Sequence, residues 1–180
     1  MNTSPENFKF CPRCGSHIRL EFKDGKSRPV CSSCRYVHFT DPKVAACVLV
    51  DVDREVLLVR RATTPHQGKW VLPAGFVDAG EDPVAAGVRE CWEETGLIVR
   101  ITALLDVHYA NSHPGGADIV IVYTGVVEGG SPKAGDDAAE VGFFPPDALP
   151  PLGFSVTKKV LTLWQRRMLS PGEGNKELTS

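Results

Sequence analysis

The sequence predicts an α/β (α+β) protein in which helices cover a mixed β-sheet, preceded by a small cysteine-rich metal module. Three features indicate this: two C-x2-C pairs near the N-terminus, apolar runs of strand length, and two amphipathic segments with a helical period. Of the 180 residues, 42% are hydrophobic and 23% are charged. This composition is that of an ordinary globular protein, so a disordered or fibrous chain is excluded.

Charge and hydropathy narrow the class of partner. No apolar run approaches the roughly 20 residues that a membrane-spanning helix needs, and the first nine residues are polar. We therefore expect a soluble, cytoplasmic protein without a membrane contact. Residues 1–43 carry a formal charge of +4 and residues 44–180 carry −6. Because the net charge is −2, the chain lacks a basic footprint for nucleic acid, which is not expected as a partner.

Four of the six cysteines form the pattern C-x2-C, sixteen residues, C-x2-C: Cys11, Cys14, Cys31 and Cys34. This spacing is typical of a zinc site, and four thiolates in a tetrahedron give Zn2+ a closed, structural site. Two disulfides, a redox pair or an iron centre with the same ligands are the alternatives. The module, residues 8–40, is too small for a large core, so the metal is expected to supply its folding energy. Cys47 and Cys91 stand in apolar surroundings and are predicted to be buried thiols.

Alternating and apolar runs predict the strands that follow the Asp41-Pro42 break. The expected strands are residues 44–51, 55–61, 70–72, 98–108, 119–127 and 141–144. The first two should form a hairpin across Asp53-Arg54.

Two helices are expected among these strands. Asp82 is a predicted N-cap, Pro83 suits the first helical position, and Gly96 suits a left-handed cap after Thr95. One face of this helix is apolar, with Val84, Val88, Cys91 and Trp92. A second amphipathic helix is predicted over residues 155–169, followed by a flexible tail, residues 171–180.

The other face of the first helix carries three carboxylates. Glu90, Glu93 and Glu94 have i, i+3, i+4 spacing and are therefore neighbours. They repel one another unless a cation lies between them, and oxygen ligands favour Mg2+ or Mn2+. Arg89 can pair with one of them and fix its orientation, and Glu81 can reach the same ion from the preceding loop. A solvated acidic face with ion pairs is the alternative interpretation.

The segment from Gly75 to Leu97 matches every fixed position of G-x5-E-x7-R-E-U-x-E-E-x-G-U, with Cys91 where an aliphatic residue is usual. The chain thereby resembles the Nudix hydrolases. The four-cysteine ribbon, Asp41-Pro42 and the run from Gly68 into this box are similar to the zinc-ribbon Nudix hydrolases. That group includes NADH pyrophosphatases and hydrolases of FAD and ADP-ribose. The resemblance implies the Nudix fold for residues 41–170, a mixed sheet between helices, and a homodimer.

The resemblance also implies an activity, the metal-dependent hydrolysis of a nucleoside diphosphate linked to another moiety. The products would be AMP and a phosphomonoester. Glu93 and Glu94 would bind the metal, and Glu90 would be a ligand or the general base. Glu140 is similar in place to an additional glutamate outside the box that binds metal or acts as base in related enzymes.

The resemblance favours ADP-ribose or FAD as the substrate. The Ser-Gln-Pro-Trp-type motif of NADH pyrophosphatases is absent from residues 107–113, and residues 134–164 are similar to the FAD and ADP-ribose hydrolases. Phe76, Tyr109 and Phe154 are candidate platforms for the base, with core packing as the alternative for each. The remaining alternatives are an NADH pyrophosphatase, or a nucleotide-sensing protein whose ribbon binds a partner or nucleic acid.

Overall fold

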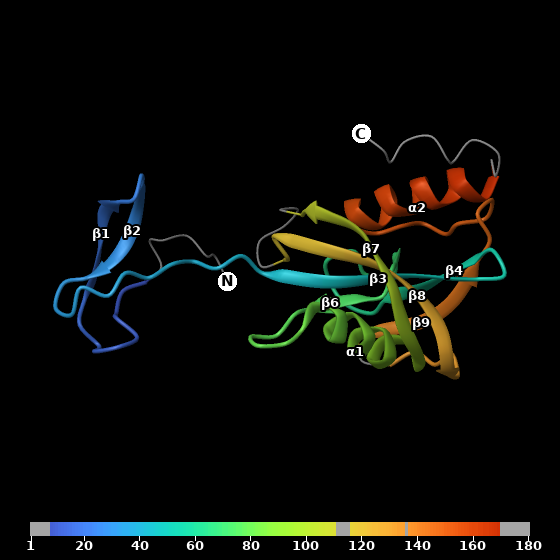
Figure 1. The fold of residues 1–180 in the computed structure, drawn as a ribbon, viewed down its shortest axis with the longest axis horizontal. Helices are drawn as coiled ribbons and strands as arrows, with labels where there is room; N and C mark the ends of the chain where they lie inside the picture. The colour runs from blue at the N-terminus through green and yellow to red at the C-terminus, as the bar shows by residue number, and fades with distance from the viewer. Residues whose placement is uncertain (1–7, 111–115, 136, 170–180) are drawn as a thin grey trace. The chain divides into compact units, whose positions relative to one another are not determined.

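The computed structural model describes residues 8–110, 116–135 and 137–169 (Figure 1). They divide into a small unit, formed by residues 8–42 and Gly116, and a larger unit, formed by the other described residues from Lys43 onwards. The predicted tail, residues 171–180, lies outside the described residues, as does the end of the stretch compared with NADH pyrophosphatases, residues 111–113. Neither helix among the described residues is long and apolar enough to cross a membrane.

The small unit is built on a two-stranded antiparallel ribbon. Strand β1 (Ile18–Lys23) pairs with β2 (Lys26–Cys31). The turn between them has positive φ at Asp24 and Gly25, which matches the right-handed twist of a tight hairpin. Buried hydrophobic side chains in the described part of this unit are few: Cys11, Val30 and Cys31. This small core is consistent with a fold that depends on a metal.

The larger unit is built on a seven-stranded mixed sheet. Its strands are β3 (Val44–Val52), β4 (Glu55–Arg61), β5 (Trp70–Val71), β6 (Ala74–Phe76), β7 (Leu97–Tyr109), β8 (Ile119–Gly130) and β9 (Ala138–Phe144). The main order is β5-β4-β3-β8-β7, with β6 paired to β3 and β9 paired to β4. Strands β3 and β8 are parallel, whereas the other neighbours are antiparallel.

The predicted hairpin exists at its turn and then opens. Asp53 and Arg54 both have positive φ, the geometry of a two-residue hairpin turn. Beyond the turn, β3 and β4 pair only through Asp51–Val56 and Val52–Glu55. Beyond these residues, β3 pairs with β6 and β8, whereas β4 pairs with β5 and β9. The divergence lets one continuous hairpin extend the sheet in two directions.

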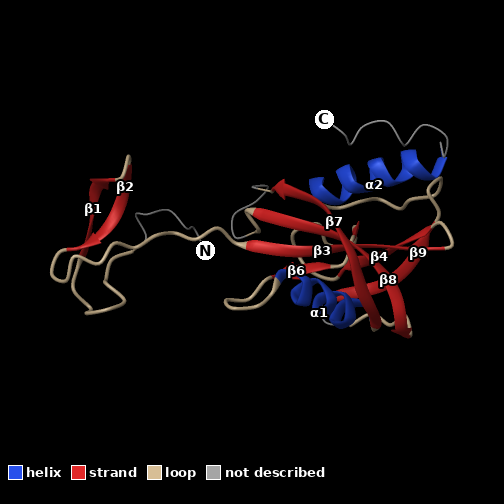
Figure 2. Ribbon diagram, viewed as in Figure 1, coloured by secondary structure: helices blue, strands red, loops and turns tan. Residues whose placement is uncertain are grey.

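Helices α1 (Pro83–Thr95) and α2 (Ser155–Leu169) cover opposite faces of this sheet (Figures 1 and 2). Leu161 of α2 packs in one buried cluster with Leu58, and Cys91 of α1 packs in another with Leu57. Adjacent residues of β4 thus point to opposite, fully covered faces, as in a strand buried on both sides. The predicted fold class, a mixed sheet between helices, is confirmed.

Helix α1 begins and ends where the sequence predicts. The Asp82 side chain accepts a hydrogen bond from the backbone N–H of Val84 at 2.7 Å, and Gly96 is left-handed with φ 69°. Helix α2 also matches its predicted bounds. Strand β6 was not predicted, because three residues that follow a proline carry no alternating pattern.

The predicted apolar face of α1 needs a correction. Cys91 is fully buried, but Val84 and Trp92 are 41% and 56% exposed, whereas Glu94 is only 4% exposed. The helix approaches the sheet through small residues, since a Cβ atom added to Gly87 would lie 3.2 Å from Val48. Val88 and Cys91 therefore pack towards the sheet as predicted, whereas the contact line includes Gly87 and Glu94 instead of Val84 and Trp92.

Candidate active site and metal centres

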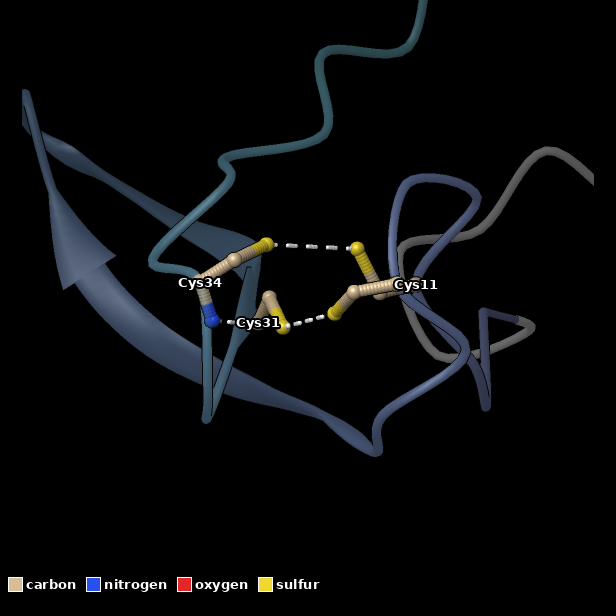
Figure 3. Close-up of side chains that lie close together, drawn as sticks. Cys11, Cys31 and Cys34 are labelled. Atoms are coloured by element: carbon tan, nitrogen blue, oxygen red, sulfur yellow. Dashed lines mark hydrogen bonds between the residues drawn. The ribbon is translucent and has the colours of Figure 1, made fainter.

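The four ribbon cysteines converge on one point. Their Sγ atoms all lie within 4.8 Å of one another. The sulfur atoms of Cys11 and Cys34 face each other at 3.7 Å (Figure 3). Those of Cys14 and Cys31 lie 3.5 Å apart. A zinc tetrahedron with bonds of about 2.3 Å has sulfur–sulfur edges of about 3.8 Å. The cluster therefore fits a four-thiolate zinc site, and the donor set would hold Zn2+ without an open position.

Backbone N–H groups point at these sulfur atoms. The N–H of Arg13 donates to Cys11 Sγ, and those of Ser33 and Cys34 donate to Cys31 Sγ, each at 3.4 Å. Such donors stabilise a thiolate, the form that binds metal. The pKa of Cys14 is lowered to about 6, first by a side-chain hydrogen bond from Ser16. The backbone donors thus favour thiolates in both turns, whereas burial and the neighbouring cysteines raise the pKa of Cys34 to about 11.

In the larger unit, Arg89 of α1 holds three glutamates in place. Its Nε and Nη2 donate to the two carboxylate oxygens of Glu81, at 2.8 and 2.9 Å. Its Nη1 donates to Glu90 Oε1 at 2.7 Å and to Glu93 Oε2 at 2.9 Å. The hydrogen bonds between the Arg89 guanidinium and Glu81 lower the pKa of Glu81 to about 2 and raise that of Arg89. The predicted pairing of Arg89 with a neighbouring carboxylate is therefore present, with three carboxylates instead of one.

Strand β6 brings a glycine against this cluster. Gly75 pairs with Ala46 of β3, and a Cβ atom on Gly75 would lie 1.9 Å from the carboxylate carbon of Glu90. Any other residue would push the carboxylate away. The first glycine of the motif is therefore explained by the space that the Glu90 side chain occupies.

Glu94 is the most deeply buried carboxylate of the cluster. It is 4% exposed, and its Oε2 accepts a hydrogen bond from the N–H of Ala74 at 3.0 Å. Burial first, and then the acidic neighbours Asp137 and Glu90, raise its pKa to about 9. A buried acid with acidic neighbours is stabilised in its charged form by a cation. Oxygen-only donors suit a hard divalent cation, but among the described residues only the ribbon cysteines, and no three of these acids, have ligand atoms within 4.8 Å of one another.

Asp137, which the sequence did not single out, belongs to this site. It lies close enough to the Glu94 carboxylate to contribute to the raised pKa of that group. Its Oδ2 also accepts from Thr63 Oγ1 at 3.3 Å and lies 3.9 Å from Arg61 Nη2. Asp137 lies just before β9, far from the helix in sequence, and no local pattern marks it. Only the sheet topology brings it to Glu94.

Glu140 lies on β9 opposite Arg60, and the two side chains pair at 2.9 Å. Glu140 and Phe144 are four residues apart on the strand and therefore point to the same face of the sheet. Phe144 packs on the α2 side. Val141 points to the opposite face and packs on the α1 side. The structure therefore brings Asp137, and not Glu140, to the buried carboxylate. The catalytic role of Glu140 stays a prediction.

The three aromatic candidates lie apart from one another. Phe76 is 46% exposed, its carbonyl accepts from Arg89, and Lys43 Nζ lies 5.4 Å from its ring centre. Tyr109 is 75% exposed at the end of β7. Phe154 packs edge-on against His66, and its ring also receives the Arg61 guanidinium at 5.1 Å. Phe76 is linked to the carboxylates through Arg89, and Phe154 is linked to Asp137 through Arg61.

The model of the NUDIX domain family matches residues 40–165, about 70% of the chain. The chain belongs to the Nudix family. A second model, described as Nudix N-terminal and named for its zinc ribbon, matches residues 9–40. The predicted class, a Nudix pyrophosphohydrolase, is thereby confirmed, and the ribbon is a recognised part of such enzymes.

Similar proteins include two curated Nudix enzymes and a solved structure. An ADP-ribose pyrophosphatase of Methanocaldococcus jannaschii is 42% identical over 69% of this chain and 74% of its own. The NAD-capped RNA hydrolase NudC of Chromobacterium violaceum is 31% identical over 85% of this chain, which spans only 57% of that relative. The crystal structure of a NUDIX hydrolase from Nitrosomonas europaea superposes with a TM-score of 0.79 at 29% identity, covering 90% and 93% of the two chains.

Proposed function

We propose that this Nudix enzyme hydrolyses the pyrophosphate bond of ADP-ribose to AMP and ribose 5-phosphate, with Mg2+ or Mn2+. The observation that carries the proposal is the placement of Glu90 and Glu93 on Arg89, with the Glu90 carboxylate against the bare backbone of Gly75 and the buried Glu94 next along the helix. The similarity to an ADP-ribose pyrophosphatase, at 42% identity, supports the substrate. NAD-capped RNA is the second substrate class, because several relatives about 30% identical are hydrolases of that cap.

In this proposal Glu93 and Glu94 would hold a divalent ion. Such an ion would supply positive charge at the pyrophosphate and a more acidic water molecule for the attack on phosphorus. Glu90 is a further ligand or the base, and Gly75 and Arg89 fix its position. Glu81, predicted as a ligand, already offers both oxygens to Arg89, so we assign it the positioning of that guanidinium.

Binding of the nucleotide needs a platform near these acids. Phe76 and Lys43 provide an exposed ring and a cation beside it, so we propose them for the base or a phosphate. Tyr109 and Phe154 stay candidates for the same role. In the ribbon, we propose that Zn2+ binds the four cysteines and has a structural role only.

Product analysis over a substrate panel tests this proposal. Purified protein with Mg2+ would receive ADP-ribose, FAD, NADH and NAD-capped RNA, with the products separated by chromatography. We expect AMP and ribose 5-phosphate from ADP-ribose. If NAD-capped RNA is cleaved while ADP-ribose is not, the substrate assignment is wrong. If none of the substrates is hydrolysed, the result would instead favour the nucleotide-sensing alternative.

A pair of variants tests whether Asp137 or Glu140 is the additional acid of the site outside the motif. Asp137→Asn removes the carboxylate that helps to raise the pKa of Glu94, and Glu140→Gln removes the one that pairs with Arg60. We expect the larger fall in kcat from Asp137→Asn. A larger fall in kcat from Glu140→Gln would instead assign the role to Glu140.

A further inference from the structure

Arg61, the last residue of β4, has a largely buried side chain with partners beside the carboxylate site. The exposed fraction of this side chain is 14%. Arg61 lies four residues after Leu57 on the same strand, so the two side chains point to the same face of the sheet. Leu57 packs on that face with Cys91 of α1. Because a guanidinium that leaves water needs hydrogen-bond acceptors, the partners of Arg61 indicate what it holds in place.

Three groups fix the Arg61 guanidinium. Its Nε donates to the carbonyl of Pro65 at 2.8 Å, and its Nη2 donates to Thr63 Oγ1 at 3.2 Å. The guanidinium also lies over the ring of Phe154, 5.1 Å from the ring centre, and such a contact stabilises a cation. In this position Nη2 is 3.9 Å from Asp137 Oδ2. A positive charge is therefore held beside the acid that the sheet topology brings to the site.

A β-bulge between β4 and β9 sets the register next to this guanidinium. Arg60 pairs with Glu140, but the next residue, Arg61, pairs with Ala138. Strand β9 therefore has one extra residue at this point, and a bulge of this kind redirects the chain and its side chains. Asp137 precedes Ala138 and lies just beyond the last pair of the ladder. The bulge thus explains why Asp137, and not an acid farther along β9, lies at the end of β4.

Residues 61–63 hold both the backbone and the side chain of Asp137. The N–H of Ala62 donates to the carbonyl of Asp137 at 2.8 Å. Thr63 Oγ1 donates to Asp137 Oδ2 at 3.3 Å, and the Arg61 guanidinium lies beside the same oxygen. The Thr63 hydroxyl also accepts from Arg61, so it joins the two charged side chains. Three consecutive residues thus act on one aspartate.

Asp137 needs such a hold because its neighbour Glu94 is also an acid. The Asp137 side chain is 40% exposed, whereas Glu94 is only 4% exposed. Two carboxylates at close range repel each other when both are charged, and the more exposed of the two can turn into the solvent. The positive charge of Arg61 opposes this movement.

We propose that Arg61 is a positioning residue, which holds the Asp137 carboxylate beside Glu94 and so keeps an additional acid at the site of the divalent ion. The inference rests on the proposed function, in which these acids act with such an ion. Arg61 would do for Asp137 what Arg89 does for the acids that it contacts. Its guanidinium touches no substrate and contributes no group to the chemical step.

Arg61→Gln tests the role through the separate effects on kcat and KM. Glutamine keeps much of the side-chain length but removes the charge. We expect kcat for ADP-ribose to fall by about tenfold, as is usual when a group that orients metal-site residues is lost, and KM to change by less than about twofold. A rise in KM with unchanged kcat would mean that Arg61 binds the substrate itself, and it would overturn the proposal.

A double-mutant cycle shows whether Arg61 acts through Asp137. In the Asp137→Asn background, Arg61→Gln should lower kcat by less than about twofold, because the group that Arg61 holds is already gone. The matched control is Arg60→Gln, which removes the neighbouring arginine that pairs with Glu140 instead. Its effect on kcat should be the same with and without Asp137→Asn. A full effect of Arg61→Gln in the Asp137→Asn background would overturn the proposal.

Binding of Mn2+ without substrate separates this inference from the proposed activity. The electron paramagnetic resonance signal of the free ion measures the affinity of the full-length, zinc-loaded protein. We expect Arg61→Gln to weaken Mn2+ binding by about tenfold, and to have little effect in Asp137→Asn. If this holds while no substrate is hydrolysed, the proposed activity fails and the inference stands. If ADP-ribose is hydrolysed while the cycle is additive, the activity stands and the inference fails. A wild type that binds no Mn2+ would overturn the inference as well.

Thr63→Ala decides the question if Arg61→Gln does not fold. Thr63 is exposed, and its hydroxyl joins Arg61 to Asp137. Loss of one such hydrogen bond should lower kcat by about threefold, and this effect should disappear in Asp137→Asn. An effect that persists in that background would overturn the proposal.

Discussion

Arg89 shows how one residue can organise a site made of like charges. It donates to Glu81, Glu90 and Glu93 at distances of 2.7–2.9 Å and to the carbonyl of Phe76 at 3.0 Å. A guanidinium has five donors in a fixed plane and can reach several acceptors at once. The acids are thereby held at set positions before any metal arrives.

Arg89→Lys keeps the charge and removes the planar fork. Lysine cannot hold Glu81 in two-point contact while it also reaches Glu90 and Glu93. We expect kcat for ADP-ribose to fall by about 10- to 100-fold, the usual effect of losing a group that orients metal ligands. Arg100→Lys, at an exposed pair with Glu128, is the matched control and should keep full activity. Wild-type kcat in Arg89→Lys would show that the fork is dispensable.

Glu94 makes the metal-free protein sensitive to pH. Its pKa rises from 4.5 to about 9 on folding, so the folded chain holds a proton that the unfolded chain releases. This contribution to stability is present below pH 4.5 and is lost as the pH rises towards 9. Relative to Glu94→Gln, the wild type should therefore become less stable over that interval. Thermal unfolding without divalent metal measures the difference. A constant difference across this range would mean that Glu94 titrates normally.

At the scale of elements, the sequence predicted what local patterns control. The caps of α1 depend on Asp82 and Gly96, whose preferences are short-range, and both bounds were correct. The exposure of Trp92 and the burial of Glu94 depend on how closely Gly87 lets the helix approach the sheet. That approach is a tertiary property without a local signal.

The residues of the carboxylate site also fall into two groups, those that local spacing predicts and those that only the tertiary structure brings to the site. Motif spacing identified Arg89 and the three helix glutamates, because an i, i+3, i+4 pattern places side chains together in any helix. Asp137 joins them only through the path of the chain from β8 to β9. A residue of this kind becomes visible once the strand order is known.

The ribbon and the sheet should differ in the reactivity of their thiols. The four ribbon cysteines share one site, whereas Cys47 and Cys91 are buried in the larger unit and burial raises the pKa of both thiols. In zinc-loaded protein we expect slow reaction with a thiol reagent. A chelator should expose the four ribbon thiols, and denaturant the remaining two. Zinc released in step with the four would confirm the assignment, whereas rapid labelling of Cys47 or Cys91 in native protein would contradict their burial.

At the scale of the whole molecule, the site forms where three parts of the larger unit meet. Strand β6 supplies the backbone of Ala74 and Gly75, α1 supplies the glutamates, and the segment before β9 supplies Asp137. Sequence separation between these parts is large, so the whole fold is needed to assemble the site. The homodimer that the family resemblance implies stays a prediction, which light scattering of the purified protein would check.

The central claim is that the glutamate cluster works through a divalent ion. The most direct measurement is AMP release from ADP-ribose against Mg2+ concentration, for the wild type, Glu93→Gln and the control Glu128→Gln, an exposed acid on β8. We expect no AMP without the metal and a saturable rise with it. Glu93→Gln should be slower by about 100-fold or more, and Glu128→Gln should match the wild type. Release of AMP at an equal rate without metal, or by Glu93→Gln, would contradict the account.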